Sequence, residues 1–464
     1  MTARKIVAIA ALALLGFAAL RDMGRLGDSL PWNRLYDFAD FYCAGSAVDQ
    51  HANPYRYEPL HGCEHAVNRT PAYRADPRRV VPAPLPPYDF PALAALSRLS
   101  FERARTLAAI AIVLAVVASI AGLAALGIPV DVAALALFFP AGYLLLDAGQ
   151  IVPFALAALV FCGVALARGR DTLAGVLAAL MLIEPHLGLP VFVAVLLLAP
   201  RARAGAAIAG LLMLAIGVFS VGLTGIREYV LGVLPAQAAA ETSYVYQYSL
   251  TYLLSRAGTP AAPALIVGQI SYVAMLAAGV WLGARVAKSL KRRELIAYLP
   301  AACGIVGGTY VHMIDVAIAI PAALVLAVAV RGGARLVASL AVTLLAVPWI
   351  AVWIGKKLLL ATLFVVAALL LRLKTAPLSA ALAFVAVALV VYGFELNPPP
   401  AFPSTAAAAT FSPTDFAQTA WAAYVGAIGS SAPEWFLIKI PTWAALLALV
   451  GVAWNAALAP PSQT

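Results

Sequence analysis

Charged residues are scarce in this chain of 464 residues, of which only 11% are Asp, Glu, Lys or Arg and 63% are hydrophobic. Soluble domains carry about 25% charged residues, so this scarcity excludes an ordinary soluble protein. In lipid, only helices and closed barrels satisfy their backbone groups, and these apolar runs lack the alternation of barrel strands. The sequence predicts an all-α polytopic membrane protein, with residues 1–464 forming a single integral membrane domain.

Several familiar motifs are also absent. The four cysteines show no zinc-type spacing, and the chain has neither a Walker-type phosphate loop nor a dinucleotide fingerprint. The net charge of +10 does not indicate a nucleic-acid partner, because the basic residues fall in short loops between apolar runs, where they orient helices. No cytoplasmic segment is long enough for a nucleotide-sugar-binding domain.

The apolar runs predict the membrane spans. The first run, 6–20, follows Arg4 and Lys5. It is either a cleaved signal peptide or an uncleaved span, and we favour the span because many others follow. A bilayer requires about 20 residues per span. Later spans are expected near 104–126, 131–146, 150–167, 172–183, 187–199, 204–223, 262–284, 295–310, 314–330, 336–354, 357–371, 377–394 and 437–458. Because several are short, we expect 11 to 14 crossings.

The charges predict which side each loop faces. Basic residues mark the cytoplasmic loops, and they are Arg168, Arg170, Arg201, Arg203, Lys288, Lys291, Arg292, Arg293, Arg331, Arg335, Arg372 and Lys374. Lys356 and Lys357 are exceptions on the outer side. The unusual polar residues all fall outside, namely Asp37, Asp40, Asp147, Gln150, Glu184, His186, His312 and Asp315. This shared side predicts one extracytoplasmic cavity.

Three longer segments are predicted to be extracytoplasmic. Residues 22–103 carry the acidic motif, a short interfacial or re-entrant helix at 91–99, and Cys43 and Cys63, which either form a disulfide or remain free thiols. Residues 224–260 hold five tyrosines, which fit an interfacial belt or stacking on sugar rings. Residues 395–436 are expected to form a loop with a short amphipathic helix.

Two acids, Asp37 and Asp40, follow the first span three residues apart, which places them on one face if the segment is helical. A carboxylate at a membrane edge is costly unless a partner or a function holds it there. Such an acid suits a general base, with a pKa raised by burial. The alternatives are a helix cap, a solvated loop acid or one ligand of a divalent metal, which the two acids alone do not establish.

Three further polar groups interrupt apolar runs. The segment from Asp147 to Gln150 is either a simple turn between spans or a site where the Gln150 side chain donates a hydrogen bond in the cavity. Glu184 and His186 flank Pro185, and His312 and Asp315 form a second pair of imidazole and carboxylate. A lone histidine is usually structural, but at the outer membrane edge a protonated one suits a phosphate or an acceptor.

The order of these motifs resembles a known family. Asp37-Phe38, Phe41-Tyr42, Ala44-Gly45 and Pro54-Tyr55 are followed by Leu85-Pro86-Pro87-Tyr88, Gly149-Gln150, Ser249-Leu250, and then His312 and Asp315. This order is similar to the polyprenyl-phosphate-sugar-dependent glycosyltransferases of the C superfamily, especially family 87, the group with mycobacterial phosphatidylinositol-mannoside mannosyltransferases. One family Lys is replaced here by Glu184, so its charge is expected from His186, Arg227, Arg256, Lys356 or Lys357.

The resemblance implies a GT-C-type fold and an inverting glycosyltransferase on the outer face of the bacterial plasma (inner) membrane. The donor would be a polyprenyl-phosphate-linked monosaccharide, mannose or a related sugar, and the acceptor a glycolipid or cell-envelope polysaccharide, among membrane lipids. Asp37 would be the catalytic base. The expected substrate-binding residues are Asp40, Tyr42, Tyr55, Gln150, Glu184, His186, Tyr248, Arg256, His312 and Asp315. No cofactor or metal is predicted.

The main alternative is a transporter or flippase for a lipid-linked precursor, which also needs intramembrane acids and broken helices. Such a protein would place its polar residues near the bilayer middle and often show repeats. A protein-modifying mannosyl- or oligosaccharyltransferase fits less well, because no large soluble domain follows the spans. The clustering of polar residues on one side favours the glycosyltransferase.

Overall fold

The computed structural model describes residues 3–25, 27, 30–68, 76–355, 358–400, 410–428 and 432–459, with only the backbone at 3–9 and 427–428. It is 79% helical. Within these ranges the only β-type pairings are two isolated bridges, Arg56 with Phe416 and Gln247 with His312. The predicted all-α class is therefore confirmed. Labels with η mark 3₁₀- or π-helical segments.

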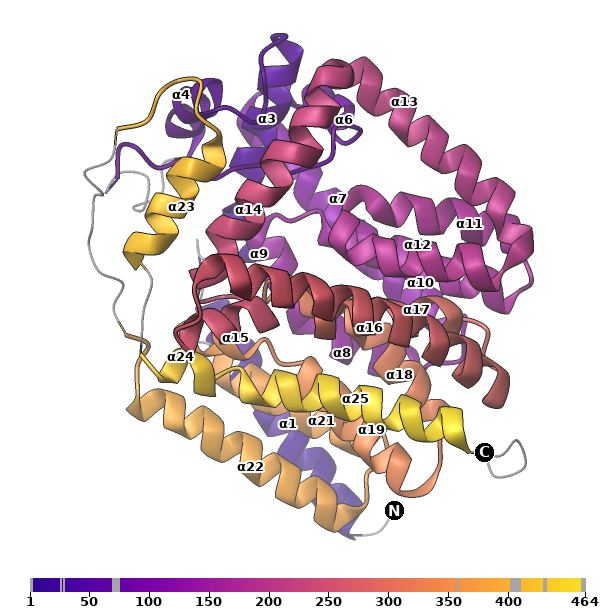
Figure 1. Cartoon of the computed structure of the whole chain (residues 1–464). Coiled ribbons are helices and arrows are strands. Elements are labelled where there is room, and N and C mark those ends of the chain that lie inside the picture. The colour runs from indigo at the N-terminus through magenta and orange to yellow at the C-terminus, as the bar shows by residue number, and fades with distance from the viewer. Residues whose placement is uncertain are drawn as a thin grey trace.

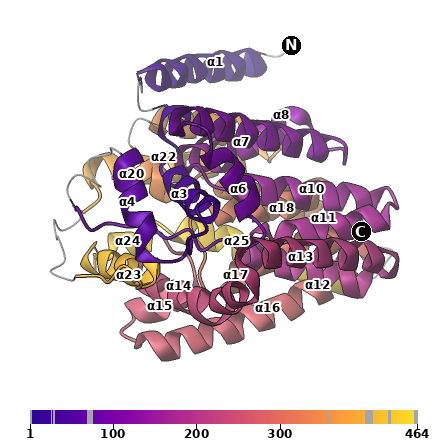
Figure 2. The ribbon, with the colours of Figure 1, turned by 90° about the horizontal axis from the view of Figure 1, so that it is seen from above.

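Six helical stretches in the described ranges are long and apolar enough to cross a membrane, as expected of a polytopic membrane protein. They are Phe101–Ala124 (α7), Val130–Ala148 (α8, η2 and α9), Pro200–Ser243 (η4 to η6), Ala261–Ser289 (α16), Pro377–Leu396 (α22) and Glu434–Leu458 (α24 and α25). Helix α1, Ala3–Gly24, packs against α21 and lies at one edge of the molecule (Figure 2).

Shorter apolar helices of 10 to 17 residues complete the bundle. They are Val152–Ala167 (α10), Asp171–Ile183 (α11 and η3), Pro185–Leu198 (α12), Leu295–Gly307 (α17), Asp315–Ala329 (η7 and α18), Gly332–Leu345 (α19) and Leu359–Arg372 (α21). Helix α17 is apolar and buried around most of its circumference, as expected of a central helix. The predicted total of 11 to 14 crossings stays a prediction.

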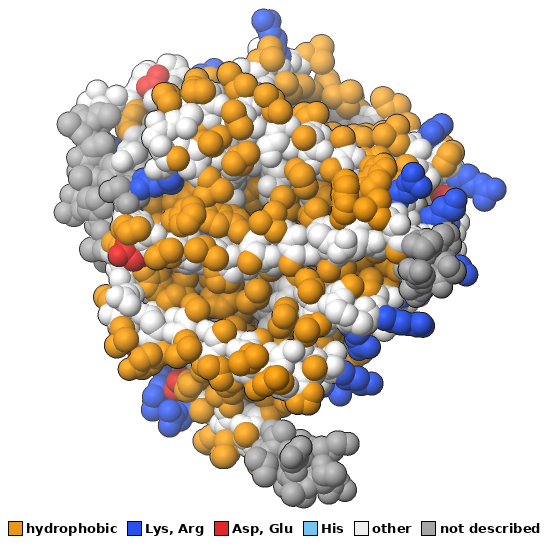
Figure 3. Space-filling model, turned by 60° about the horizontal axis from the view of Figure 1, so that its bottom comes forward, with side chains coloured by type: hydrophobic (Ala, Val, Ile, Leu, Met, Phe, Trp, Pro, Cys, Tyr) orange, Lys and Arg blue, Asp and Glu red, His pale blue; other side chains and the backbone are white. Residues whose placement is uncertain are grey.

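The two ends of the bundle differ in charge. The basic residues predicted to be cytoplasmic follow the C-terminal ends of α10, α12, α16, α18 and α21 or begin the next helix. Lys and Arg side chains accordingly gather along the right edge in Figure 3, while apolar side chains cover the face between the ends. Phe219, on the lipid-facing side of α13, is 91% exposed. The basic residues therefore gather at one end of the bundle, and the membrane side that this end faces stays a prediction.

At the opposite end, short helices from distant parts of the sequence form a cap on the bundle (Figure 1). They are α2 (Pro31–Arg34), α3 (Phe38–Asp49), α4 (Tyr57–Val67), α6 (Phe90–Ser97), α14 (Leu234–Ala240), α15 (Leu250–Arg256) and α23 (Ala417–Ile428). Cys43 on α3 and Cys63 on α4 form a disulfide, with their Cα atoms 5.6 Å apart. Arg56 joins this cap to α13 through an ion pair with Glu228.

Some segments differ from the sequence-based expectation. The predicted span 336–354 is two helices, α19 and α20 (Trp349–Ile354), because Pro348 has no amide hydrogen to continue the helical ladder. The predicted loop 224–260 is largely helical, and Gly222, with φ +71°, kinks α13 (Arg203–Glu228) before it. The short helix expected at 91–99 is confirmed as α6. Lys356 and Lys357 lie outside the described residues.

Packing of α3 on α6 depends on Gly45. A Cβ atom there would lie 2.4 Å from the Leu93 carbonyl carbon, so backbone atoms would have to move. We predict that Gly45→Ala lowers the free energy of unfolding by about 1–3 kcal/mol, as overpacking does. Unfolding can be followed by a thiol-reactive dye, because the free Cys162 and Cys303 are buried.

The matched control is Gly426→Ala on α23, where a new Cβ has no neighbour within 4 Å. Alanine favours a helix over glycine by about 1 kcal/mol, so this variant should unfold at or slightly above the wild-type temperature. A Gly45→Ala protein with the same free energy of unfolding as the wild type would show that the α3–α6 contact is not tight.

Candidate functional site

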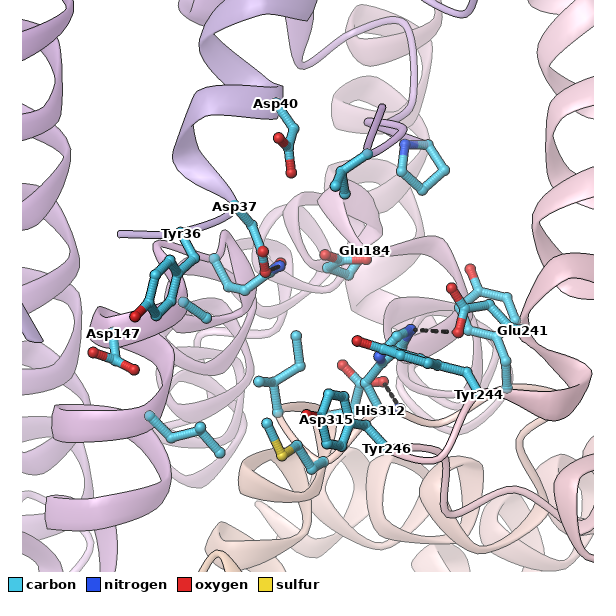
Figure 4. A pocket seen from close by; sticks show the side chains of 18 of the residues that line it. Tyr36, Asp37, Asp40, Asp147, Glu184, Glu241, Tyr244, Tyr246, His312 and Asp315 are labelled. Carbon is cyan, nitrogen blue, oxygen red and sulfur yellow. Dashed lines mark hydrogen bonds and ion pairs between the residues drawn. The ribbon is translucent and has the colours of Figure 1, made fainter. Parts of the chain in front are cut away.

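A cavity of about 440 Å³ lies between the cap and the helix ends beneath it. All eight polar residues predicted to share one side line this cavity: Asp37, Asp40, Asp147, Gln150, Glu184, His186, His312 and Asp315. They come from helix breaks that are far apart in the sequence, and Figure 4 shows the Asp37, Asp40, Glu184, His312 and Asp315 side chains around one space. The prediction that these residues share one polar cavity is therefore confirmed, and its extracytoplasmic location stays a prediction.

Asp37 is held where two chain segments meet. Leu35 adopts a left-handed conformation with φ 40°, and Gly149 does so with φ +75°. The Asp37 amide donates to the Ala148 carbonyl at 2.7 Å, and Gln150 Nε2 donates to the Asp37 carboxylate. The acidic motif and the Gly-Gln motif therefore form one unit.

The Asp37 carboxylate is available to the cavity. Asp37 is the N-cap residue of α3, but its side chain makes no capping hydrogen bond, so the simple cap interpretation fails. Burial raises its pKa, while the Gln150 hydrogen bond and the nearby His312 and Arg79 charges oppose that rise. Asp40, in the first turn of α3, is 2% exposed and lines the same cavity.

His186 lies between two carboxylates. Its Nε2 is 3.3 Å from Asp315 Oδ2, and its Nδ1 is 3.6 Å from Glu184 Oε2. The same Asp315 oxygen accepts the His312 backbone N–H at 2.8 Å. Asp315 therefore holds both histidines, one through its ring and the other through its main chain.

The His312 ring lies beside the Glu241 carboxylate in the cavity wall (Figure 4). Their Nε2 and Oε2 atoms are 3.3 Å apart. Burial alone would lower the pKa of His312, but the Glu241 carboxylate, helped by Asp315 and Asp37, raises it to about 9. His312 is therefore a cation at neutral pH, and it lies on the same cavity as the Asp37 carboxylate.

Another part of the cavity wall is apolar. It includes Leu144, Met313, Ile314, Ala351, Ile354 and Leu358. Arg34 also lines the cavity, with its guanidinium 3.5 Å from the Asp147 carboxylate. The cavity thus combines carboxylates, cationic groups and a wall suited to hydrocarbon.

Four predicted substrate-binding residues lie elsewhere. The Tyr42 hydroxyl donates to the Leu99 carbonyl at 2.9 Å, and the Tyr55 hydroxyl to the Leu85 carbonyl at 2.8 Å. Tyr248 is buried against Trp443, and Arg256 ends α15 outside the cavity. None of these four residues lines the cavity, and the hydroxyls of Tyr42 and Tyr55 instead hold backbone segments.

Sequence reasoning missed Glu241, Arg34 and Trp421, all of which line the cavity. Glu241 could have been found by the argument used for Asp37, because an acid among aromatic residues near a membrane is costly. Trp421 could not, because nothing in the 395–436 segment predicts that α23 folds back over the cavity. Among the described residues, Arg227 and Arg256 do not line the cavity, whereas Arg34 does.

The described residues hold no group of three or more His, Cys, Asp or Glu side chains arranged for a metal ion. No protein-family model, curated protein or solved structure matches this chain. The candidate site therefore has to be interpreted from its own geometry.

The junction that positions Asp37 depends on Gly149. A Cβ atom at this residue would lie 2.9 Å from the Leu35 Cβ, in a conformation that costs other residues roughly 1–2 kcal/mol. We predict that Gly149→Ala lowers the thermal stability and displaces Gln150 from Asp37. The measurement is the unfolding temperature, with hydrogen exchange at residues 35–38 as a local probe.

Gly127→Ala is the matched control, because Gly127 has a similar φ of +85° but no neighbour within 4 Å of a new Cβ. The difference between the two variants isolates the contact with Leu35, which should add about 1–3 kcal/mol of destabilisation. Equal destabilisation by both would show that the contact with Leu35 contributes nothing.

Proposed function

We propose that this protein is an inverting glycosyltransferase of the GT-C type that uses a polyprenyl-phosphate-linked monosaccharide. One observation carries the proposal: a half-buried carboxylate, Asp37, shares a cavity with a cationic imidazole, His312. Sugar transfer needs a base for the acceptor hydroxyl and a positive group for the leaving phosphate. The order of sequence motifs supports the same activity.

In the proposed reaction, Asp37 removes the proton of an acceptor hydroxyl as its oxygen attacks the anomeric carbon. The new carbon–oxygen bond forms on the face opposite the phosphate, so the configuration inverts. The bond between the anomeric carbon and the phosphate oxygen breaks, and its electron pair leaves with the phosphate. The His312 cation stabilises that developing negative charge.

The cavity lining supports a lipid-linked donor. The apolar wall formed by Leu144, Ile354, Leu358 and their neighbours suits the first isoprene units of the lipid. Arg34 and His312 would provide the positive charge that the family Lys provides, because Glu184 occupies that position here. Glu184 and the other carboxylates suit hydrogen bonds from sugar hydroxyls.

The position of the cavity supports an active site on the outer face of the bacterial plasma membrane. It lies at the helix ends opposite the basic loops, which are expected to be cytoplasmic. The Cys43–Cys63 disulfide in the adjoining cap is typical of an oxidising compartment. A transporter or flippase would instead bind its cargo near the bilayer middle between repeats. Acceptors with a glycolipid or polysaccharide hydroxyl would enter from the aqueous side.

The first test concerns the base. Asp37→Asn should lower sugar transfer by about 10²–10⁴-fold, because it removes general-base catalysis while preserving shape. The assay uses synthetic polyprenyl-phosphate sugars and membrane lipid extract. The control is Asp49→Asn at the other end of α3, where the carboxylate is paired with Arg98 outside the cavity. Asp49→Asn should keep wild-type transfer.

Other outcomes would separate the alternatives. Full transfer by Asp37→Asn would rule out Asp37 as the base, and loss in Asp40→Asn would then assign the role to Asp40. If the wild type transfers no sugar but moves the lipid-linked donor across proteoliposomes, the protein is a transporter.

The second test is the pH dependence of transfer. The rate should rise with pH as Asp37 loses its proton, at a pH above the ordinary range of aspartate because burial raises its pKa. It should fall again near pH 9, where His312 loses its proton. The profile of kcat/KM between pH 4 and 10 should be bell-shaped. A wild-type rate that stays level through pH 10 would show that the His312 cation is not required.

A further inference from the structure

Glu241 is a carboxylate of the cavity that three side-chain donors hold. Its Oε1 accepts from Gln237 Nε2 at 3.0 Å and from Trp421 Nε1 at 2.7 Å, and its Oε2 accepts from Gln247 Nε2 at 2.8 Å. These donors come from α14, α23 and the chain between η6 and α15. Glu241 is 1% exposed, so the three hydrogen bonds replace the water that an ionised carboxylate would otherwise need.

The fourth contact of Glu241 is His312. Gln247 donates to Glu241 through its amide nitrogen and accepts the Val311 backbone N–H at 2.6 Å through its amide oxygen. Gln247 and His312 also form one of the two β-bridges, and the Tyr248 amide donates to the Val311 carbonyl at 2.7 Å. The backbone of His312 and the carboxylate facing its ring are thus fixed by the same residue.

We propose that Glu241 is the positioning residue that aims the His312 ring into the cavity and keeps it protonated. Oriented donors on three segments hold the carboxylate, so it cannot turn away from the imidazole without losing hydrogen bonds. An ionised carboxylate at this distance favours the imidazolium. The assignment deepens the proposed function, because it rests on His312 as the group that receives the leaving phosphate.

Some of the other titratable groups around His312 favour its protonation and others oppose it. The acids are Asp315, whose oxygen holds the His312 backbone N–H, and the more distant Asp37 and Glu184. His186 is the nearby cation that opposes protonation. The Tyr244 and Tyr310 rings lie 5.6 and 6.4 Å from the imidazole ring. Glu241 is the carboxylate in contact with the ring itself, so its removal should have the largest effect.

The test measures the protonation of His312 without using enzyme activity. Diethyl pyrocarbonate modifies neutral imidazole and not imidazolium, and peptide mass spectrometry reports the extent at each histidine. The full-length protein in detergent is modified briefly between pH 5 and 10. In the wild type, His312 should become reactive near pH 9, at a higher pH than N-acetylhistidine added to the same sample as a free imidazole. In Glu241→Gln, the midpoint for His312 should fall by about 2 pH units.

Glu228→Gln is the matched control. Glu228 lies in the same outer region but pairs with Arg56 rather than with His312, so its loss should leave the His312 midpoint unchanged. The inference is overturned if His312 in Glu241→Gln has the wild-type midpoint. It is also overturned if His312 in the wild type becomes reactive over the same pH range as the added N-acetylhistidine, a comparison that needs no variant.

The sugar-transfer assay then connects this pairing to the reaction. In Glu241→Gln the descending part of the kcat/KM profile should move to lower pH by the same interval as the modification midpoint. If the wild type transfers no sugar while the midpoint still shifts, the proposed function fails and the role of Glu241 in holding His312 stands.

Discussion

A carboxylate beside a membrane needs a cation or several hydrogen-bond donors, because ionisation without them is too costly. This constraint accounts for the arrangement of the cavity. Asp147 has Arg34, Asp315 has His186, and Glu241 has His312 together with three donors. Asp37 differs from these three: its hydrogen-bond partner is the neutral Gln150, and among the described residues no cation forms an ion pair with it. A carboxylate held in this way is the one best able to take and release a proton.

The constraint also explains why the polar residues lie at helix ends. The first backbone N–H groups and the last C=O groups of a helix lack partners within it, so helix ends need polar surroundings. Pro185, at the first position of α12, begins a helix without needing an N–H partner, and it places Glu184 and His186 on either side of the break. Short helices such as α12, whose ends lie at the cavity, thus leave room for it and provide part of its polar lining.

The helical class followed from the sequence, and so did the sharing of one cavity by the eight polar residues that interrupt or flank the apolar runs. These features depend on composition, run length and the order of polar breaks along alternating helices. The contacts themselves could not be predicted. The Tyr42 and Tyr55 hydroxyls hold backbone carbonyls, and this role depends on tertiary packing. Tertiary packing also places α23 over the cavity, where Trp421 contacts Glu241. Leu358 and Trp421, which follow Ile354 in the chain, line the cavity because of tertiary packing that no local sequence pattern indicates.

Glu184 illustrates how a single replacement changes the expected chemistry. Where the resembling family has a lysine, this chain has a carboxylate that shares His186 with Asp315. In the proposed reaction, a lysine there would attract the donor phosphate, whereas Glu184 would repel it and suit a sugar hydroxyl. The positive charge for the phosphate then has to come from another part of the cavity wall, where Glu241 holds the imidazolium of His312 and Arg34 lies beside the apolar residues. The sugar would therefore lie toward Glu184 and Asp315, and the phosphate toward the cationic groups.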